Sequence, residues 1–179
     1  MPFLTKKELV NKPLGTAREL NEILERKNGS IDYKKTVFLF YNPSDQALVQ
    51  PIVNILKSLR INLYVDFVDN DQLENKVTGL AGILKERIDK ADKIIFLSTP
   101  EGKEILVSSN DFGLNGSLKN TEKVVVFPIT KMAQMWEEKN SYERYGFINK
   151  KFTLFNFPDD WMIQFPGGEK MSLKSWILK

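Results

Sequence analysis

The chain of 179 residues contains no cysteine and no histidine. Disulfides, thiolate zinc sites and cysteine nucleophiles are therefore excluded, and so are catalytic triads and metal sites that depend on histidine. Acid–base or nucleophilic chemistry has to rely on Asp, Glu, Lys, Tyr, Ser or Thr. The absence of cysteine also fits a reducing compartment, so we expect a cytoplasmic protein.

Long hydrophobic runs and blocks of one charge are missing as well. No apolar run approaches the roughly 18 residues that a membrane span needs, and residues 1–11 are too charged for a signal peptide. The formal net charge is only +3, and no cluster of Lys or Arg stands out. We therefore expect neither a nucleic acid nor a membrane as a partner.

The sequence also lacks the common nucleotide-binding motifs. It has neither G-x-x-x-x-G-K-[ST] nor G-x-G-x-x-G. Response-regulator receivers carry an acidic pair just after their first strand, whereas this chain has Tyr41, Asn42 and Pro43 at that place. The receiver interpretation is thus disfavoured.

What the sequence does contain is an alternation of buried strands and amphipathic helices. Runs that are apolar on both faces predict strands, and apolar residues at helical spacing predict helices. This alternation predicts a flavodoxin-like, three-layer α/β domain with a parallel sheet of four or five strands. The expected strands are residues 36–41, 62–68, 93–98 and 123–129, with a short fifth at 152–157, and the expected helices are 46–59 and 80–90.

Outside this core we predict two flanking segments. Residues 1–34 are expected to form a helical extension outside the sheet, and residues 35–179 the domain with an aromatic C-terminal tail. Ser172 is expected to cap a last helical turn that carries Trp176 and Ile177. The tail aromatics are expected to pack over the sheet edge, with a partner surface as the alternative. They are Trp136, Tyr142, Tyr145, Phe147, Phe152, Phe155, Phe157 and Trp161.

Ligands of doubly wound folds bind beyond the carboxyl ends of the strands. That rule selects the loops at residues 41–45, 67–79, 98–116 and 129–132. In the first of these, Ser44 or Asp45 can instead cap the following helix. The acidic stretch 69–78 is interpreted as a solvated loop, and no metal site is predicted.

Four segments, in order and spacing, resemble the bacterial TIR (Toll/interleukin-1 receptor) domain. Residues 38–45 resemble the first TIR motif, an aromatic–aliphatic strand followed by a polar loop that ends in Asp. Residues 63–69 resemble the second strand with its Asp–aromatic pair. Residues 88–99 are similar to the helix and the Ser-ending third strand, and residues 124–129 to the fourth strand with its trailing proline.

The resemblance implies a choice between two activities. Some TIR domains assemble through homotypic contacts, and others cleave the nicotinamide–ribose bond of NAD+. Bacterial stand-alone members often serve anti-phage systems of the Thoeris type, in which they make a nucleotide signal that a downstream effector reads. The leading hypothesis is an NAD+ nucleosidase or cyclase that self-associates, with NAD+ as substrate and no cofactor.

The enzymatic members carry a catalytic Glu after the third strand, and Asp111 falls on that position here. The two Trp positions of the same stretch hold Val107 and Asn110. An Asp keeps the carboxylate, which can stabilise an oxocarbenium-like centre, but its side chain is one methylene shorter. Glu101 and Glu104 lie nearby and could replace it. The residues expected to bind substrate are Tyr41, Asn42, Ser44, Asp45, Asp66, Phe67, Thr99 and Asn110.

Each of these residues also has a structural interpretation. Tyr41 and Phe67 can stack on a ligand or simply pack under the loops. Asp66 can face the cleft or hold a loop, and Asp111 can be a solvated residue or a helix cap. Two other functions stay open: a non-catalytic TIR adaptor, which the Glu-to-Asp change favours, and a nucleoside deoxyribosyltransferase-like enzyme, which would share the architecture.

Overall fold

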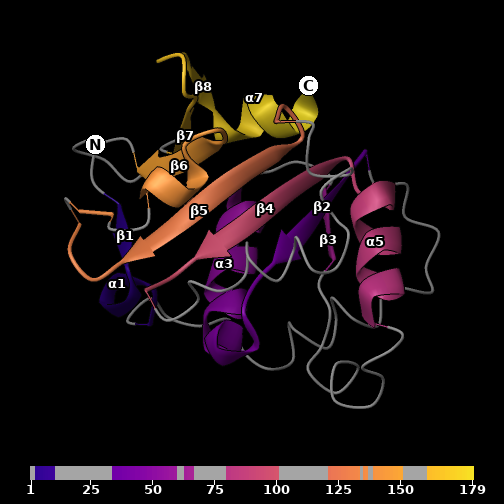
Figure 1. Ribbon diagram of the computed structural model, residues 1–179, viewed down its shortest axis with the longest axis horizontal. Helices are drawn as coiled ribbons and strands as arrows, with labels where there is room; N and C mark the ends of the chain where they lie inside the picture. The colour runs from indigo at the N-terminus through magenta and orange to yellow at the C-terminus, as the bar shows by residue number, and fades with distance from the viewer. Residues whose placement is uncertain are drawn as a thin grey trace.

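The structure is a computed structural model, and it describes residues 3–10, 34–59, 63–66, 80–100, 121–133, 135–136, 139–150 and 161–179. In these residues the fold is α/β, with a central sheet flanked by helices (Figure 1). The prediction of a flavodoxin-like fold with a mostly parallel sheet is therefore confirmed. None of the helices in this part of the chain is long and apolar enough to cross a membrane.

The sheet has a parallel centre and an antiparallel extension. The strand order is β3-β2-β4-β5-β6-β7-β8, and every neighbour from β3 to β6 is parallel. Strands β7 and β8 continue the sheet in antiparallel fashion. The bounds are β2 Lys35–Phe40, β3 Leu63–Asp66, β4 Lys93–Ser98, β5 Val124–Thr130, β6 Gly146–Lys150, β7 Trp161–Gln164 and β8 Lys170–Ser172.

The helices that were predicted between the core strands are present. Helix α3 spans Gln46–Ser58 and α5 spans Leu80–Lys90, close to the expected ranges. Strands β2, β4 and β5 also lie at their predicted positions. The predicted strand at 152–157 lies outside the described residues, whereas β6, which was not predicted, adds a parallel strand beside β5. The shorter helical pieces are α1 Lys6–Val10, η2 Pro43–Asp45, η4 Lys139–Tyr142 and α7 Leu173–Leu178.

Successive residues of the central strands point to two different cores, because side chains alternate across a strand. In β2, Val37 and Leu39 face the larger core, which includes residues of α3 and α7. Phe38 and Phe40 face the other core, which includes Ile88 of α5. The continuous apolar runs in the sequence therefore reflect burial on both faces, as expected for a parallel sheet with helices on each side.

The N-terminal residues belong to the sheet, contrary to the expectation that they lie outside it. Strand β1, Leu4–Thr5, pairs in parallel with Ile129 and Thr130 of β5. Helix α1 follows and packs on α3, and Leu9 is fully buried. The prediction is wrong for residues 4–10 because Leu4 and Leu9 fill the larger core. Residues 11–33 lie outside the described residues, and the division at residues 34 and 35 stays a prediction.

The C-terminal helix ends the chain as predicted. Ser172 is the N-cap of α7, and its Oγ accepts a hydrogen bond of 3.0 Å from the backbone N–H of Ser175. Trp176 and Ile177 are buried in the larger core. The interpretation of the aromatic tail as packing is confirmed for Trp136, Tyr142, Tyr145 and Trp161, which are all buried. Phe152, Phe155 and Phe157 lie outside the described residues.

Candidate functional site

The carboxyl ends of β2, β4 and β5 lie at one edge of the sheet, because these strands are parallel neighbours. β2 ends at Phe40, β4 at Ser98 and β5 at Thr130. The residues that directly follow these strands are Tyr41–Asp45, Thr99 and 131–133. The structure therefore brings the first residues of three of the four predicted ligand loops to this edge. Figure 1 shows β4 and β5 running side by side toward it.

A buried hydrogen bond joins two of these loops. The hydroxyl of Thr99 donates to Oδ2 of Asp45 at 2.6 Å, and each residue is only 1% exposed. Asp45 follows β2 and Thr99 follows β4, so the contact holds the two loops together at the edge. Both residues were predicted to belong to the site, and the structure does bring them together.

This contact replaces the helix cap that the sequence suggested. Asp45 occupies the N-cap position of α3, but its side chain makes no capping hydrogen bond. Its backbone dihedral angles are φ −100° and ψ 11°, whereas a capping residue normally has an extended conformation. The capping prediction is wrong for Asp45, because its carboxylate accepts from Thr99 instead.

Asn42 and Ser44 make a local turn rather than a cap. Oδ1 of Asn42 accepts hydrogen bonds from the backbone N–H of Ser44 at 3.0 Å and from its hydroxyl at 2.7 Å. Such Asx turns are typical of Asn in loops. The Ser44 side chain is therefore used within its own loop, although the residue itself is exposed at the edge.

Of the remaining predicted site residues, two lie within the described part of the chain and three lie outside it. Tyr41 is half-buried and packs against the larger core, and stacking of its ring on a ligand stays a prediction. Asp66 is the last residue of β3 and pairs with Phe38 in the register. Phe67, Asn110 and Asp111 lie outside the described residues, so the assignment of catalysis to Asp111 stays a prediction. Glu101, Glu104 and the acidic loop at 69–78 lie outside them as well.

Sequence reasoning missed one polar pair at this edge. The indole N–H of Trp136 donates to the hydroxyl of Ser98 at 3.2 Å, and both side chains are buried. The ring of Trp136 stacks on Tyr142 with centroids 5.7 Å apart. Ser98 was recognisable as the last residue of a buried strand. Trp136 could not be placed, because nothing in the sequence pattern indicates which buried hydroxyl an isolated Trp will meet.

The described part of the edge thus offers hydroxyl groups, an amide and one buried carboxyl group. Such groups can bind ribose or phosphate oxygens and can fix loops. Among the described residues, no three acidic side chains lie together as metal ligands would.

A substitution at Thr99 tests the link between the loops. Thr99→Val keeps the shape of the side chain but removes the donor to the buried Asp45 carboxyl group. We expect a loss of about 1–3 kcal/mol in the free energy of unfolding, measured by urea titration. Thr130→Val is the matched control, because its hydroxyl donates to the Met132 carbonyl within a turn. Equal losses in the two variants would contradict a special role for the Thr99 contact.

Comparison with known proteins gives one informative similarity. No protein-family profile matches the sequence. The chain is 27% identical over 113 residues to a probable 3' cyclic ADP-D-ribose synthase, ThsB', of Bacillus cereus (strain MSX-D12). The match covers 61% of this chain and 58% of that protein, so the chain aligns with less than two thirds of its relative. Together with the parallel sheet and the order of its motifs, this similarity supports the resemblance stated from the sequence, which is to TIR proteins of the Thoeris type.

Proposed function

We propose that this protein is an NAD+-processing enzyme of bacterial anti-phage defence. It would cleave the nicotinamide–ribose bond of NAD+ and release a product of the ADP-ribose type as a signal. The observation that carries the proposal is the similarity to a protein named as a probable cyclic ADP-ribose synthase. The carboxyl edge of the sheet supports it, since this is where doubly wound folds bind nucleotides.

The main requirement of the proposed reaction is stabilisation of the ribosyl cation. The bond between the ribose carbon and the nicotinamide nitrogen breaks, and the electron pair leaves with nicotinamide. Water then captures the ribosyl cation in hydrolysis, or a nucleophile of the same molecule captures it in cyclisation. A carboxylate beside this centre lowers its energy, and we assign that role to Asp111. NAD+ is the substrate in this scheme, and no further cofactor is required.

We assign the described residues mainly to positioning. Asp45 and Thr99 are buried and bonded to each other, so they hold the loops that follow β2 and β4. Asn42 and Ser44 form the turn of the first loop. We propose that direct contacts with NAD+ come from Tyr41, Asp66, Phe67 and Asn110. We further propose that the protein acts in the cytoplasm, self-associates, and passes its product to a separate effector.

The test is incubation of concentrated protein with NAD+ and measurement of released nicotinamide. We expect release by the wild type and at least about 100-fold slower release by Asp111→Asn, since a misplacement of about 1 Å already costs about that factor and the amide removes the charge altogether. Asp89→Asn is the control, because Asp89 is exposed on α5. Absence of release under every oligomer-promoting condition would refute the proposed activity. Unchanged release by Asp111→Asn would refute only the assignment of the residue.

A second candidate is a non-catalytic TIR adaptor that works through self-assembly. The specific observation in its favour is Asp111 at a position where enzymatic members carry Glu. Wild-type protein that assembles but releases no nicotinamide would support the adaptor. Transfer of a base from a deoxynucleoside, with NAD+ untouched, would instead support the deoxyribosyltransferase-like alternative.

A further inference from the structure

A cavity of about 400 Å³ lies at the edge of the sheet opposite to the candidate functional site. Lys93, the first residue of β4, and Gly146, the first residue of β6, line it. Thr99, in the candidate site, follows the other end of β4. A strand rises about 3.3 Å per residue, so the two places are separated by the length of β4, about 17 Å. The volume of the cavity is within the usual range for small-molecule sites, which is about 300–1,000 Å³.

The floor of this cavity holds a buried cation. Lys93 is only 9% exposed, and its Nζ lies 4.8 Å from the ring centroid of Trp176. Its hydrogen-bond acceptor is the backbone carbonyl of Glu122 at 3.5 Å, the long limit for such a contact. No carboxylate among the described residues forms an ion pair with Lys93. An ammonium group has three donors, so the geometry leaves capacity for an anionic acceptor.

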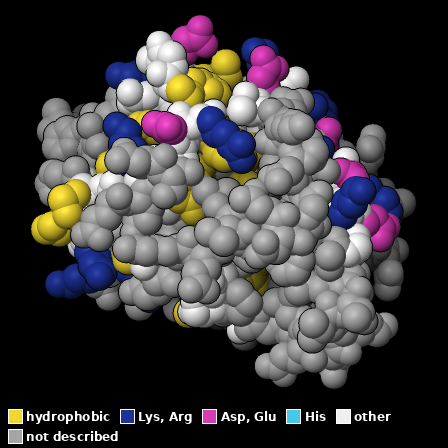
Figure 2. All heavy atoms as spheres, viewed as in Figure 1, with side chains coloured by type: hydrophobic (Ala, Val, Ile, Leu, Met, Phe, Trp, Pro, Cys, Tyr) yellow, Lys and Arg dark blue, Asp and Glu magenta, His cyan; other side chains and the backbone are white. Residues whose placement is uncertain are grey.

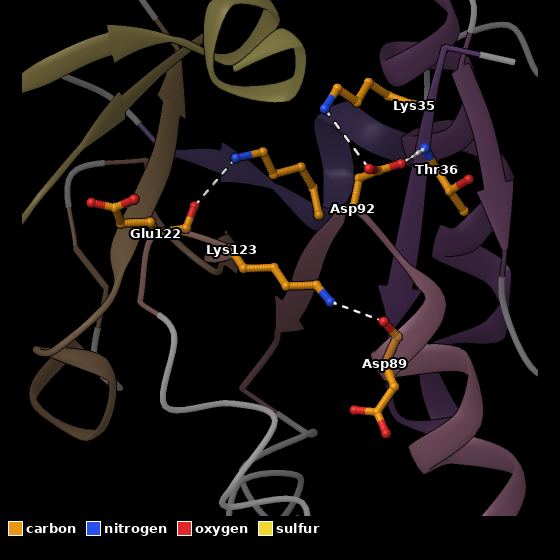
Figure 3. A network of polar contacts seen from close by, with 7 residues as sticks. Lys35, Thr36, Asp89, Asp92, Glu122 and Lys123 are labelled. Carbon is orange, nitrogen blue, oxygen red and sulfur yellow. Dashed lines mark hydrogen bonds and ion pairs between the residues drawn. The ribbon is translucent and has the colours of Figure 1, made fainter.

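The two carboxylates whose charges act on Lys93, those of Glu122 and Asp92, do not pair with its ammonium group. In Figure 3 the side chain of Glu122 points away from the lysine contact that its carbonyl accepts. Asp92 accepts a hydrogen bond of 2.7 Å from the backbone N–H of Thr36 and lies 3.8 Å from Nζ of Lys35. Lys123 donates to the carbonyls of Ile88 and Asp89, outside the cavity.

Charges of both signs surround the buried ammonium group of Lys93. Burial lowers the pKa of the Lys93 ammonium group, and the charges of Lys35 and Lys179 lower it further, whereas Glu122 and Asp92 oppose the shift. Arg144 and Lys179 lie on the rim of the cavity, together with Glu122 and Glu169. A bound anion would relieve the repulsion among the cations and replace the water that Lys93 has lost.

One part of the cavity wall is apolar. Trp176 lies beside Lys93, and Phe165 and Met171 come from the β7–β8 hairpin. That hairpin turns through Gly168, whose φ of +86° suits glycine. Figure 2 shows hydrophobic side chains among basic and acidic ones over the C-terminal elements, at the top of the view. On this part of the wall an aromatic or apolar body would contact Phe165, Met171 and Trp176.

We propose that this cavity is a second ligand site, which binds a small molecule with an aromatic or apolar body and one anionic group, with the anion on Lys93. The site is separate from the NAD+ cleft of the proposed function and does not depend on it. A phosphate ester and a carboxylate share this chemistry, so the test includes one of each.

The probes are phenyl phosphate, benzoate and the neutral benzyl alcohol, added to the full-length protein. Binding is followed by the NMR signals of the tryptophan indole N–H groups. We expect a saturable shift of the Trp176 signal with phenyl phosphate, while the Trp136 signal, from the other edge, stays in place. Binding of benzoate as well would indicate recognition of any anion, and binding of phenyl phosphate alone would indicate a phosphate ester. Binding of neither, or equal binding of benzyl alcohol, would overturn the proposal.

Variants at two lysines assign the anion contact. Lys93→Met keeps the length of the side chain and is expected to weaken binding of the anionic probe by at least about tenfold, the usual consequence of losing one charged hydrogen bond. Lys123→Met is the matched control, because Lys123 lies at the same edge but its Nζ donates to carbonyls of α5. Equal affinity in Lys93→Met and wild type would refute the assignment. If Lys93→Met does not fold, the indole shifts of the wild type still decide whether the site exists.

Discussion

Trp176→Ala is expected to lower the free energy of unfolding by about 3–5 kcal/mol, the usual cost of truncating a buried aromatic residue. Trp176 is 2% exposed in the larger core, and its indole N–H donates to the carbonyl of Glu122 at 2.9 Å. The ring therefore joins α7 to Glu122, which lies two residues before the start of β5. Since whole domains are stable by only about 5–15 kcal/mol, this is a large share.

Thermal and urea unfolding of the variant measure this effect. For a chain of this size the expected decrease in Tm is roughly 6–20 °C, at about 2–4 °C per kcal/mol. Trp176→Phe keeps most of the buried ring and loses only the hydrogen bond, so we expect a loss of about 1–2 kcal/mol. If alanine and phenylalanine gave the same small loss, the ring would contribute little to holding α7 on the sheet.

Trp136→Ala is expected to have an equally large effect from the other end of β5, about 3–5 kcal/mol. The side chain is 6% exposed and donates to Ser98, and its ring meets Phe3 with centroids 5.9 Å apart. Phe3 is also held by its backbone N–H, which donates to the Ala133 carbonyl at 2.7 Å. Loss of the Trp136 ring should therefore loosen the N-terminal residues as well as the smaller core.

Amide hydrogen exchange separates the two effects. In Trp136→Ala the amide of Phe3 should exchange faster than global unfolding alone explains, since local opening has its own free energy. Trp176→Ala is the matched control, because it removes an indole of the same size at the opposite edge. Equal acceleration at Phe3 in both variants would show that Trp136 acts only through global stability.

The central sheet could be predicted from the sequence because its strands are apolar on both faces. Lys93–Ser98 is an example: every residue is buried, and the bounds follow from the sequence. Helix α5 was equally clear from its apolar spacing. The resemblance to TIR domains rested on the same segments, and the similarity to ThsB' supports it.

The pairings that depend on distant parts of the chain could not be predicted. Strand β1 has only two residues, so it carries no periodic pattern, and its partner lies at Ile129 and Thr130. Asp45 looked like a helix cap because capping is a local property, whereas its actual donor, Thr99, follows another strand. Lys93 was interpreted only as the start of a strand, since burial of its ammonium group depends on α7 and the β7–β8 hairpin.

The position of β1 has a consequence for the order of folding. β1 binds the second half of β5, while β6 binds the first half. A ribosome delivers Leu4 and Leu9 first, but their strand partner exists only after Ile129 and Thr130 have been synthesised. Closing so long a loop costs chain entropy, so the N-terminal strand is expected to join late. Until then the side chains of Leu4 and Leu9, which fill the larger core of the folded protein, stay exposed and can bind to apolar surfaces of other proteins.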